Sequence, residues 1–192
     1  NEYYKIWSNH HINLDGWSAN AVLVEFEHIY ESKVKGENLE LNSLKLYSDY
    51  ISWLNNFDKN KAAYYWKSYL NHYDKKASLK GEARKFSGEK YAHKDYKFNL
   101  TEQTFLKLQQ IAAANKTTLN TIIQSAWGIL LSKYNNTNDV VFGSLVSGRP
   151  STLEGVQDII GIFINTVPHR IRYESTQSFD ELLHQTQHSF IE

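Results

Sequence analysis

The sequence has 192 residues, of which 41% are hydrophobic and 22% are charged, as in an ordinary globular protein. Lys plus Arg and Asp plus Glu each total 21, so there is no net charge to attract nucleic acid or an anionic membrane, and no basic stripe takes its place. Cysteine is absent, which excludes disulfides, thiolate metal ligands and a cysteine nucleophile.

No apolar run approaches the ~20 residues of a membrane span, and no signal-peptide pattern opens the chain. The sequence therefore predicts a cytoplasmic protein with neither a nucleic-acid nor a membrane partner. Methionine is also absent, including at position 1, so we expect the chain to be a piece of a longer protein.

The first half of the chain predicts one strand followed by three helices. Residues 3–12 mix aromatic and β-branched residues with polar ones, as strands do, and Asp15 with Gly16 is typical of a turn. From Ala19 the apolar residues recur at helical spacing, and Gly36 is expected to end this helix. The same spacing predicts two more helices, over about 44–57 and over 61–73.

The second half predicts further strands and helices after a polar connection. Residues 74–92 are rich in Lys, Gly, Ser and Glu and are expected to join two subdomains. The apolar run 140–146 indicates a strand covered on both faces, and Ser178 with Glu181 fits a capping box that begins a last helix. The other predicted elements are strands over 96–100 and 168–173 and helices over 102–114 and 119–134. This mixture favours an α/β fold in two lobes.

Residues 10–18 (HHINLDGWS) hold the densest group of chemically active side chains. If residues 3–12 are extended, His10 and His11 point to opposite faces. His10 then shares an apolar face with Tyr4 and Ile6 and is expected in the core, while His11 shares the wetter face with Tyr3. Two diverging imidazoles cannot bind one metal ion, so no metal site is predicted.

The rest of this segment suits a reactive histidine. Gly16 allows a tight turn and the close approach of a substrate. A helix that begins near Ser18 directs free N–H groups toward the turn, where they favour negative charge. Asp15 can accept hydrogen bonds or pair with an arginine and so hold the histidine in place. Taken singly, each of these residues is also compatible with an ordinary turn and helix start.

Residues 10–18 resemble the His-His-x-x-x-Asp-Gly-Trp-Ser signature of condensation domains in nonribosomal peptide synthetases, which share their fold with chloramphenicol acetyltransferase. Four later segments resemble blocks of the same family in the same order: 47–53 (YSDYISW), 65–67 (YWK) with Leu70, 139–150 (DVVFGSLVSGRP) and 160–166 (IGIFINT) with Arg170. The resemblance implies a two-lobed chloramphenicol acetyltransferase-like α/β fold. The end of the N-terminal lobe is expected in residues 1–90 and the start of the C-terminal lobe in residues 91–192.

The resemblance implies that an amide bond forms between a donor acyl or peptidyl thioester and an acceptor aminoacyl amine. Both groups would be tethered to 4'-phosphopantetheine arms of carrier domains, with no cofactor bound directly. The implied partners are these carrier domains and the adenylation domain of the same synthetase. The Gly-Trp-Ser order at 16–18 and the paired histidines favour condensation over the related epimerisation and heterocyclisation domains. A catalytically silent carrier-binding piece and a free-standing coenzyme A-dependent acyltransferase stay open as alternatives.

The family's pattern makes His11 the catalytic histidine, supported by Asp15 and Gly16. The N–H groups of residues 16–18 are expected to cradle the oxyanion that forms on the thioester carbonyl. His10, Trp17 and Ser18 are expected in secondary roles around the substrates.

Two residues outside the motif are further candidates. Asn165 is expected either to contact substrate or to cap a turn. The arginine that usually pairs with the motif aspartate belongs to an upstream block that this sequence lacks. Arg149 is therefore expected either to replace that arginine beside Asp15 or to hold the turn after its own strand.

Overall fold

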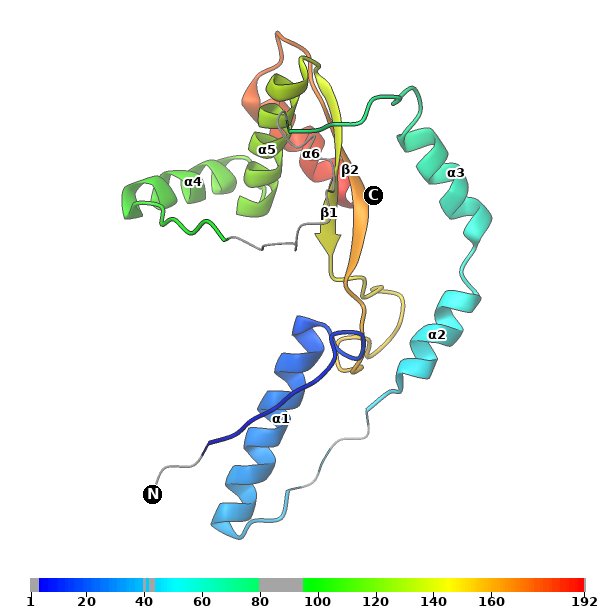
Figure 1. The fold of residues 1–192 in the computed structure, drawn as a ribbon, viewed down its shortest axis with the longest axis vertical. Coiled ribbons are helices and arrows are strands. Elements are labelled where there is room, and N and C mark those ends of the chain that lie inside the picture. Colours follow the sequence, from blue (N-terminus) through cyan, green and yellow to red (C-terminus); the bar gives the residue numbers. More distant parts are fainter. Residues whose placement is uncertain (1–3, 40, 42–43, 80–94, 192) are drawn as a thin grey trace, which may run out of the picture. The chain divides into compact units, whose positions relative to one another are not determined.

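The computed structural model of the chain describes residues 4–39, 41, 44–79 and 95–191 (Figure 1). Its contacts divide the chain into two compact units. Unit 1 comprises Asn1–Lys67 and Leu145–Val167, and unit 2 comprises Ser68–Ser144 and Pro168–Glu192. Most of the predicted connection over 74–92 lies outside the described residues, and so does the boundary at residue 90. The assignment of 1–90 and 91–192 to two lobes therefore stays a prediction.

The helices that begin in unit 1 confirm the three predicted from apolar spacing, with shifted ends. They are α1 (Gly16–Lys35), α2 (Tyr47–Asn55) and α3 (Lys59–Tyr69). α1 begins earlier than Ala19 because the Asp15 side chain caps its first turn. Gly36 ends α1 as predicted, with a left-handed φ of 71° and an N–H directed back at the last turn.

The core of unit 1 is small and surrounds one aromatic ring. Val156, Ile159 and Phe163 are buried together against Tyr47 and Tyr50 of α2. The Tyr47 hydroxyl donates a hydrogen bond of 2.6 Å to the carbonyl of Ile162. This packing fixes the backbone of the 156–163 segment, which bonds to the start of α1.

Gly148 allows the turn after β1 to pass close to that segment. Its φ is +65°, and a Cβ atom at this position would lie 1.8 Å from the carbonyl oxygen of Phe163. A side chain at residue 148 is therefore excluded both by backbone conformation and by space.

Unit 2 is built on helices packed beside a strand pair (Figure 1). Its helices are α4 (Glu102–Ala114), α5 (Leu119–Asn135) and α6 (Phe179–Ile191), and the strands are β1 (Asp139–Val146) and β2 (Asn165–Arg172), whose far ends belong to unit 1. The Tyr173 N–H donates to the Asn138 carbonyl at 3.0 Å, so the start of β1 lies beside the end of β2 and the pair is antiparallel. These elements confirm the predicted helices and the strands near 140–146 and 168–173.

The helix start predicted at Ser178 is confirmed in its details. The Glu181 carboxylate accepts from the Ser178 N–H at 2.8 Å, and the Ser178 hydroxyl accepts from the Glu181 N–H at 3.3 Å. This reciprocal pair is the capping box that the sequence indicated.

Two predicted strands are not formed in the described residues. Residues 4–10 and 96–100 have no regular structure, and 11–13 form a turn. Tyr4 and Ile6 are 85% and 93% exposed. A strand needs a neighbour for its ladder, and among the described residues neither segment pairs with one. The placement of His10 in the core is therefore wrong, while Tyr3 lies outside the described residues.

The prediction that both faces of β1 are covered is also wrong. Val140 and Ser144 are buried, but Leu145 is 68% exposed. The described sheet has two strands, and the helices of unit 2 cover only part of its surface. The side chain of Leu145 lies on the uncovered part.

An aspartate–arginine pair in unit 2 ties the end of α3 to the strands. Arg170 of β2 donates to both carboxylate oxygens of Asp139, at 2.8 and 2.5 Å. Its other nitrogen donates to the carbonyls of Tyr69 and Asn71, at 2.7 and 3.0 Å. Arg170 thus satisfies carbonyls at the C-terminus of α3, where a cation is favoured.

His169 is the neighbouring polar side chain of β2 and is almost fully buried. It is 2% exposed between the rings of Phe142 and Phe190, and its Nε2 atom has no hydrogen-bond partner in the described part of the chain. Burial lowers the pKa of His169 because the protonated ring would lose its hydration.

Candidate active site

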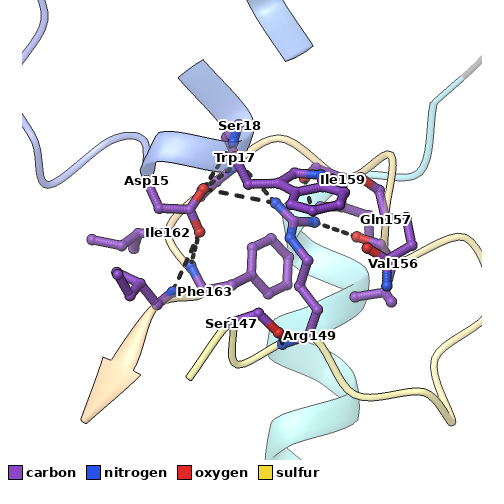
Figure 2. A network of polar contacts seen from close by, with 12 residues as sticks. Asp15, Trp17, Ser18, Ser147, Arg149, Val156, Gln157, Ile159, Ile162 and Phe163 are labelled. Atoms are coloured by element: carbon purple, nitrogen blue, oxygen red, sulfur yellow. Dashed lines mark hydrogen bonds and ion pairs between the residues drawn. The ribbon is translucent and has the colours of Figure 1, made fainter. Parts of the chain in front are cut away.

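Asp15 joins the start of α1 to the segment that precedes β2 (Figure 2). Its Oδ1 atom accepts from the Ser18 N–H at 2.8 Å, and Oδ2 accepts from the N–H groups of Phe163 and Ile164 at 2.9 and 3.3 Å. The residue is only 4% exposed. One buried carboxylate therefore holds two segments that are almost 150 residues apart in the sequence.

The Ser18 hydroxyl completes this connection. It donates to the Gly161 carbonyl at 2.7 Å and accepts from the Gly161 N–H at 3.1 Å and from Arg149 Nη2 at 2.9 Å. A hydroxyl has one hydrogen to donate and two lone pairs, so Ser18 uses its full capacity inside the protein. A secondary role by the substrate was expected for Ser18, but its hydroxyl faces this buried network.

Arg149 makes both of the contacts that the sequence left open. Its Nη2 atom lies 3.9 Å from Asp15 Oδ1, which is the contact expected of a replacement for the upstream arginine. Its Nη1 atom donates to the carbonyls of Val156 and Ile159, which holds the turn after β1. The guanidinium also lies over the Phe163 ring, 4.0 Å from its centre.

The electrostatics keep this pair charged. Burial by itself raises the pKa of Asp15, but hydrogen bonds from Ser18 and Phe163 and the charge of Arg149 outweigh it, so the net pKa is lowered. Burial lowers the pKa of Arg149, while the charges of Asp15 and Asp158 oppose that change. A buried charge of this kind depends on its partner, because loss of either leaves the other without compensation.

The two histidines differ in the loop that precedes the network. The Nδ1 atom of His10 accepts from the Ile12 N–H at 3.1 Å, and the His10 carbonyl accepts from the Asn13 N–H at 3.1 Å. His11 is exposed and makes no hydrogen bond with the described residues. Both histidines are exposed, so the expected contrast between a core His10 and an accessible His11 is not found. They differ only in that His10 bonds within its own turn.

Gly16 borders open space at the first turn of α1. A Cβ atom on this residue would meet nothing within 4 Å. The adjoining cavity has a volume of about 300 Å³ and is lined by Asp15, Gly16, Trp17, Leu145, Val146, Ser147, Arg149 and Ile164. Gly16 has no left-handed φ, so a tight turn does not require glycine here. Within the described residues, neither backbone conformation nor packing requires glycine at this position.

The predicted group of N–H donors at 16–18 is smaller than expected. The Ser18 N–H is occupied by the Asp15 carboxylate. The N–H groups of Gly16 and Trp17 precede the first intrahelical bond and have no partner among the described residues. Only these two can serve an oxyanion.

Trp17 and Asn165 lie at the edge of the site. The Trp17 indole N–H donates to the Gln157 carbonyl at 3.0 Å, which fixes the ring beside the 157–160 segment. Asn165 is exposed, and its side-chain oxygen accepts from the Thr166 N–H at 2.8 Å. Asn165 is the first residue of β2, so it does not cap a turn, and its contact with substrate stays a prediction.

Within the described ranges, no group of three or more His, Asp or Glu side chains converges as a metal site would require. The same residues include no helix with the length and apolar character needed to cross a membrane.

A model of the condensation-domain family matches residues 1–192, the full length of the sequence. The chain belongs to the condensation-domain family. Its sequence is 43% identical over 190 residues to bacitracin synthase 3 of Bacillus licheniformis and 38% identical over 187 residues to tyrocidine synthase 3 of Brevibacillus parabrevis. These matches cover 99% and 97% of the chain but only 3% of each relative, so the chain spans a small part of the curated relatives it matches.

Solved structures give the fold of this condensation-domain chain. The first condensation domain of the CDA synthetase superposes with a TM-score of 0.76 at 17% identity, covering 95% of the chain and 41% of that structure. The epimerization domain from the third module of tyrocidine synthetase B gives 0.70 at 21% identity, with coverage of 94% and 42%. The expected chloramphenicol acetyltransferase-like α/β fold class is thereby confirmed.

Sequence reasoning named the acidic and basic residues of the buried network but not the backbone groups that complete it. The acceptor and donor groups of Gly161, and the N–H groups of Phe163 and Ile164, complete the network. These groups are present in every residue and leave no signal of their own in a sequence. The only indication was that residues 160–166 resemble a family block.

Proposed function

We propose that this chain carries the reaction-centre segment of a condensation domain that joins a donor thioester to an acceptor amine, and that His11 handles the proton of that amine. The observation that carries the proposal is the contrast within residues 10–18. Asp15 and Ser18 are locked into a buried network, whereas His11, four residues earlier, presents an exposed imidazole without a partner. An imidazole fits this task because its ring nitrogen can accept a proton from a neighbouring group and pass it on.

The proposed reaction needs little chemistry from the protein beyond orientation. The nitrogen of the acceptor attacks the donor carbonyl, a C–N bond forms, the C–S bond breaks, and the thiol leaves. An α-amine has a pKa of about 7.7–8.0, so roughly a tenth is neutral at pH 7. Proton removal by His11 then contributes less than the usual ~10²–10⁴-fold of a general base. Positioning of two tethered reactants contributes up to about 7–11 kcal/mol in ideal cases.

The open side of Gly16 is the proposed place for the donor carbonyl. Negative charge develops on its oxygen as the amine attacks, and the free N–H groups of Gly16 and Trp17 can donate to it. The N-terminus of a long helix also favours this charge. The missing Cβ leaves room for the thioester beside the helix.

The substrates define the proposed partners. Both acyl groups would arrive on 4'-phosphopantetheine arms of carrier domains, loaded by the adenylation domain of the same synthetase, in the cytoplasm. The names of the relatives support this setting, because bacitracin synthase and tyrocidine synthase are peptide synthetases. They do not favour a free-standing acyltransferase that uses coenzyme A.

A catalytically silent carrier-binding piece is the second candidate. The exposure of His11 favours it, because a general base usually acts inside a site from which water is excluded. The two candidates make different predictions for His11. In the catalytic candidate its removal slows amide formation, and in the silent candidate its removal has no effect.

The test replaces His11 by Ala in the complete condensation domain and measures single-turnover amide formation between two loaded carriers. We expect a loss of tenfold or more, with carrier binding unchanged. His10→Ala is the matched control. It should slow amide formation less, because His10 only bonds within its own loop. An unchanged rate in His11→Ala would remove the catalytic proposal and leave the silent one.

A further inference from the structure

A second pocket shares the lining residue Trp17 with the cavity beside Gly16. Its volume is about 470 Å³, and its walls come from α1, from Leu39, Leu41 and Leu44, and from the 157–160 segment, all in unit 1. The bond from the Trp17 indole N–H to the Gln157 carbonyl fixes the ring of this shared lining residue (Figure 2). Most of the lining is apolar: Trp17, Ala21, Val24, Leu39, Leu41, Leu44 and Ile160.

The polar groups on these walls are mainly acidic. Glu25 of α1 and Asp158 of the facing segment both line the pocket, together with Asn20, His28 and Gln157. Among the described residues that line it, none is a lysine or arginine. A pocket of this composition favours an apolar group that ends in a positive charge and disfavours an anion such as a phosphate.

Glu25 differs from the other glutamates of α1. Glu27 pairs with Lys5 at 3.3 Å, and Glu31 pairs with Lys35 at 3.7 Å. Glu25 is half-buried, yet it has no ion pair or hydrogen bond with the described residues. A partly desolvated carboxylate that lacks a partner gains most from a cation supplied by a ligand. The negative charge of Asp158 is already felt by Arg149, so Glu25 is the principal recognition group.

We propose that this pocket binds an aliphatic chain ending in an ammonium or guanidinium group. The identity of the occupant rests on the proposed function: it is the side chain of a carrier-bound basic amino acid. The apolar walls contact the stem, and Glu25 pairs with the charged end. Because Trp17 lines both this pocket and the cavity beside Gly16, the side chain would lie next to the proposed place of the carbonyl.

The first experiment tests the pocket without any reaction. The full chain is titrated with n-hexylammonium, n-hexanol and hexanoate, and binding is followed by the NMR signals of the indole N–H groups. We expect n-hexylammonium to bind about three- to fivefold more tightly than n-hexanol, as a partly exposed ion pair allows, and hexanoate to bind most weakly. Equal affinity for n-hexylammonium and n-hexanol would overturn the charge recognition, and no binding at all would overturn the pocket.

Paired variants assign the effect to residues. Glu25→Gln should abolish the preference for n-hexylammonium while keeping n-hexanol binding, and Glu27→Gln is the matched control that should change neither. Val24→Phe should fill the pocket and weaken both ligands, whereas Val34→Phe, on an exposed part of α1 that does not line it, should weaken neither. A preference that survives in Glu25→Gln contradicts the proposal.

A condensation assay separates this proposal from the proposed function. In the complete domain, Glu25→Gln should lower amide formation with a lysyl or ornithyl substrate several-fold and leave a leucyl substrate unchanged. If no substrate is condensed, the proposed function fails while ligand binding can still stand. If leucyl and lysyl substrates are equally affected by Glu25→Gln, the assignment of the occupant fails.

Discussion

Two aspartate–arginine pairs stabilise this chain, and they are built differently. Asp139 and Arg170 in unit 2 contact each other directly through two hydrogen bonds and are partly exposed. Asp15 and Arg149 in unit 1 are buried at 3.9 Å, and most of their hydrogen bonds go to Ser18 and to backbone groups. The first pair fastens two elements together, whereas the second shapes the loops around the candidate active site. The difference predicts which substitutions disturb function and which disturb only stability.

The largest effect is expected for Arg149→Ala. The change leaves the buried Asp15 carboxylate and two carbonyls without their cation, and breaking such a pair costs about 3–5 kcal/mol. Chemical denaturation measures the loss. Arg172→Ala is the matched control, because Arg172 is exposed and forms no ion pair with the described residues. Similar stability of the two variants would show that the buried network is not the main support of unit 1.

Asp139→Asn should cost less, about 1.5–3 kcal/mol, because the charge-assisted hydrogen bonds it weakens are partly exposed. The condensation rate per folded molecule should stay unchanged, since neither Asp139 nor Arg170 bonds to the Asp15 network. A rate that falls with Asp139→Asn at full folding would erase the distinction between the two pairs.

Acid should weaken the two units in different pH ranges. The folded pKa of His169 is lowered by burial, so its neutral form is favoured and stability falls as pH drops below about 6.5. The pKa of Asp15 is also lowered, so its contribution is complete above about 3.9 and is lost as pH falls through the folded value. His169→Phe should remove the first loss, which denaturation at pH 7 and pH 5 detects. A pH dependence that persists in this variant would assign it to another group.

Gly16→Ala should have the smallest effect on stability, within about 0.5 kcal/mol, because the position is helical and the new methyl group meets open space. Amide formation should nevertheless fall tenfold or more, since the methyl group occupies the proposed place of the thioester. Full activity of Gly16→Ala, with stability unchanged, would move the reacting carbonyl elsewhere.

The helices were predictable because their signals are local. Apolar spacing gave α4 its observed bounds, the Ser178–Glu181 pair marked the start of α6, and Gly36 marked the end of α1. Strands depend on a neighbour that the local pattern does not contain. Residues 4–12 and 96–100 have strand-like composition, yet no described strand pairs with them.

The candidate site was predictable in its side chains and not in its connections. The motif identified His11, Asp15 and Gly16, and two alternatives were kept for Arg149, both of which occur. The central position of Ser18 was not predicted, because its partners are the backbone of Gly161 and a side chain 131 residues away. Contacts at such separations are fixed only when the core around Phe163 forms.

The central proposal is that His11 handles the proton of the acceptor amine. The loop that carries His11 runs into Asp15, which bonds to Ser18, so we expect the Ser18 network to affect catalysis by positioning His11. A double-mutant cycle with Ser18→Ala and His11→Ala, read by single-turnover amide formation in the complete domain, tests it most directly. The account predicts that Ser18→Ala slows the reaction in the presence of His11 and has little further effect once His11 is replaced. Losses that multiply independently, or a His11→Ala variant as fast as the parent, would contradict it.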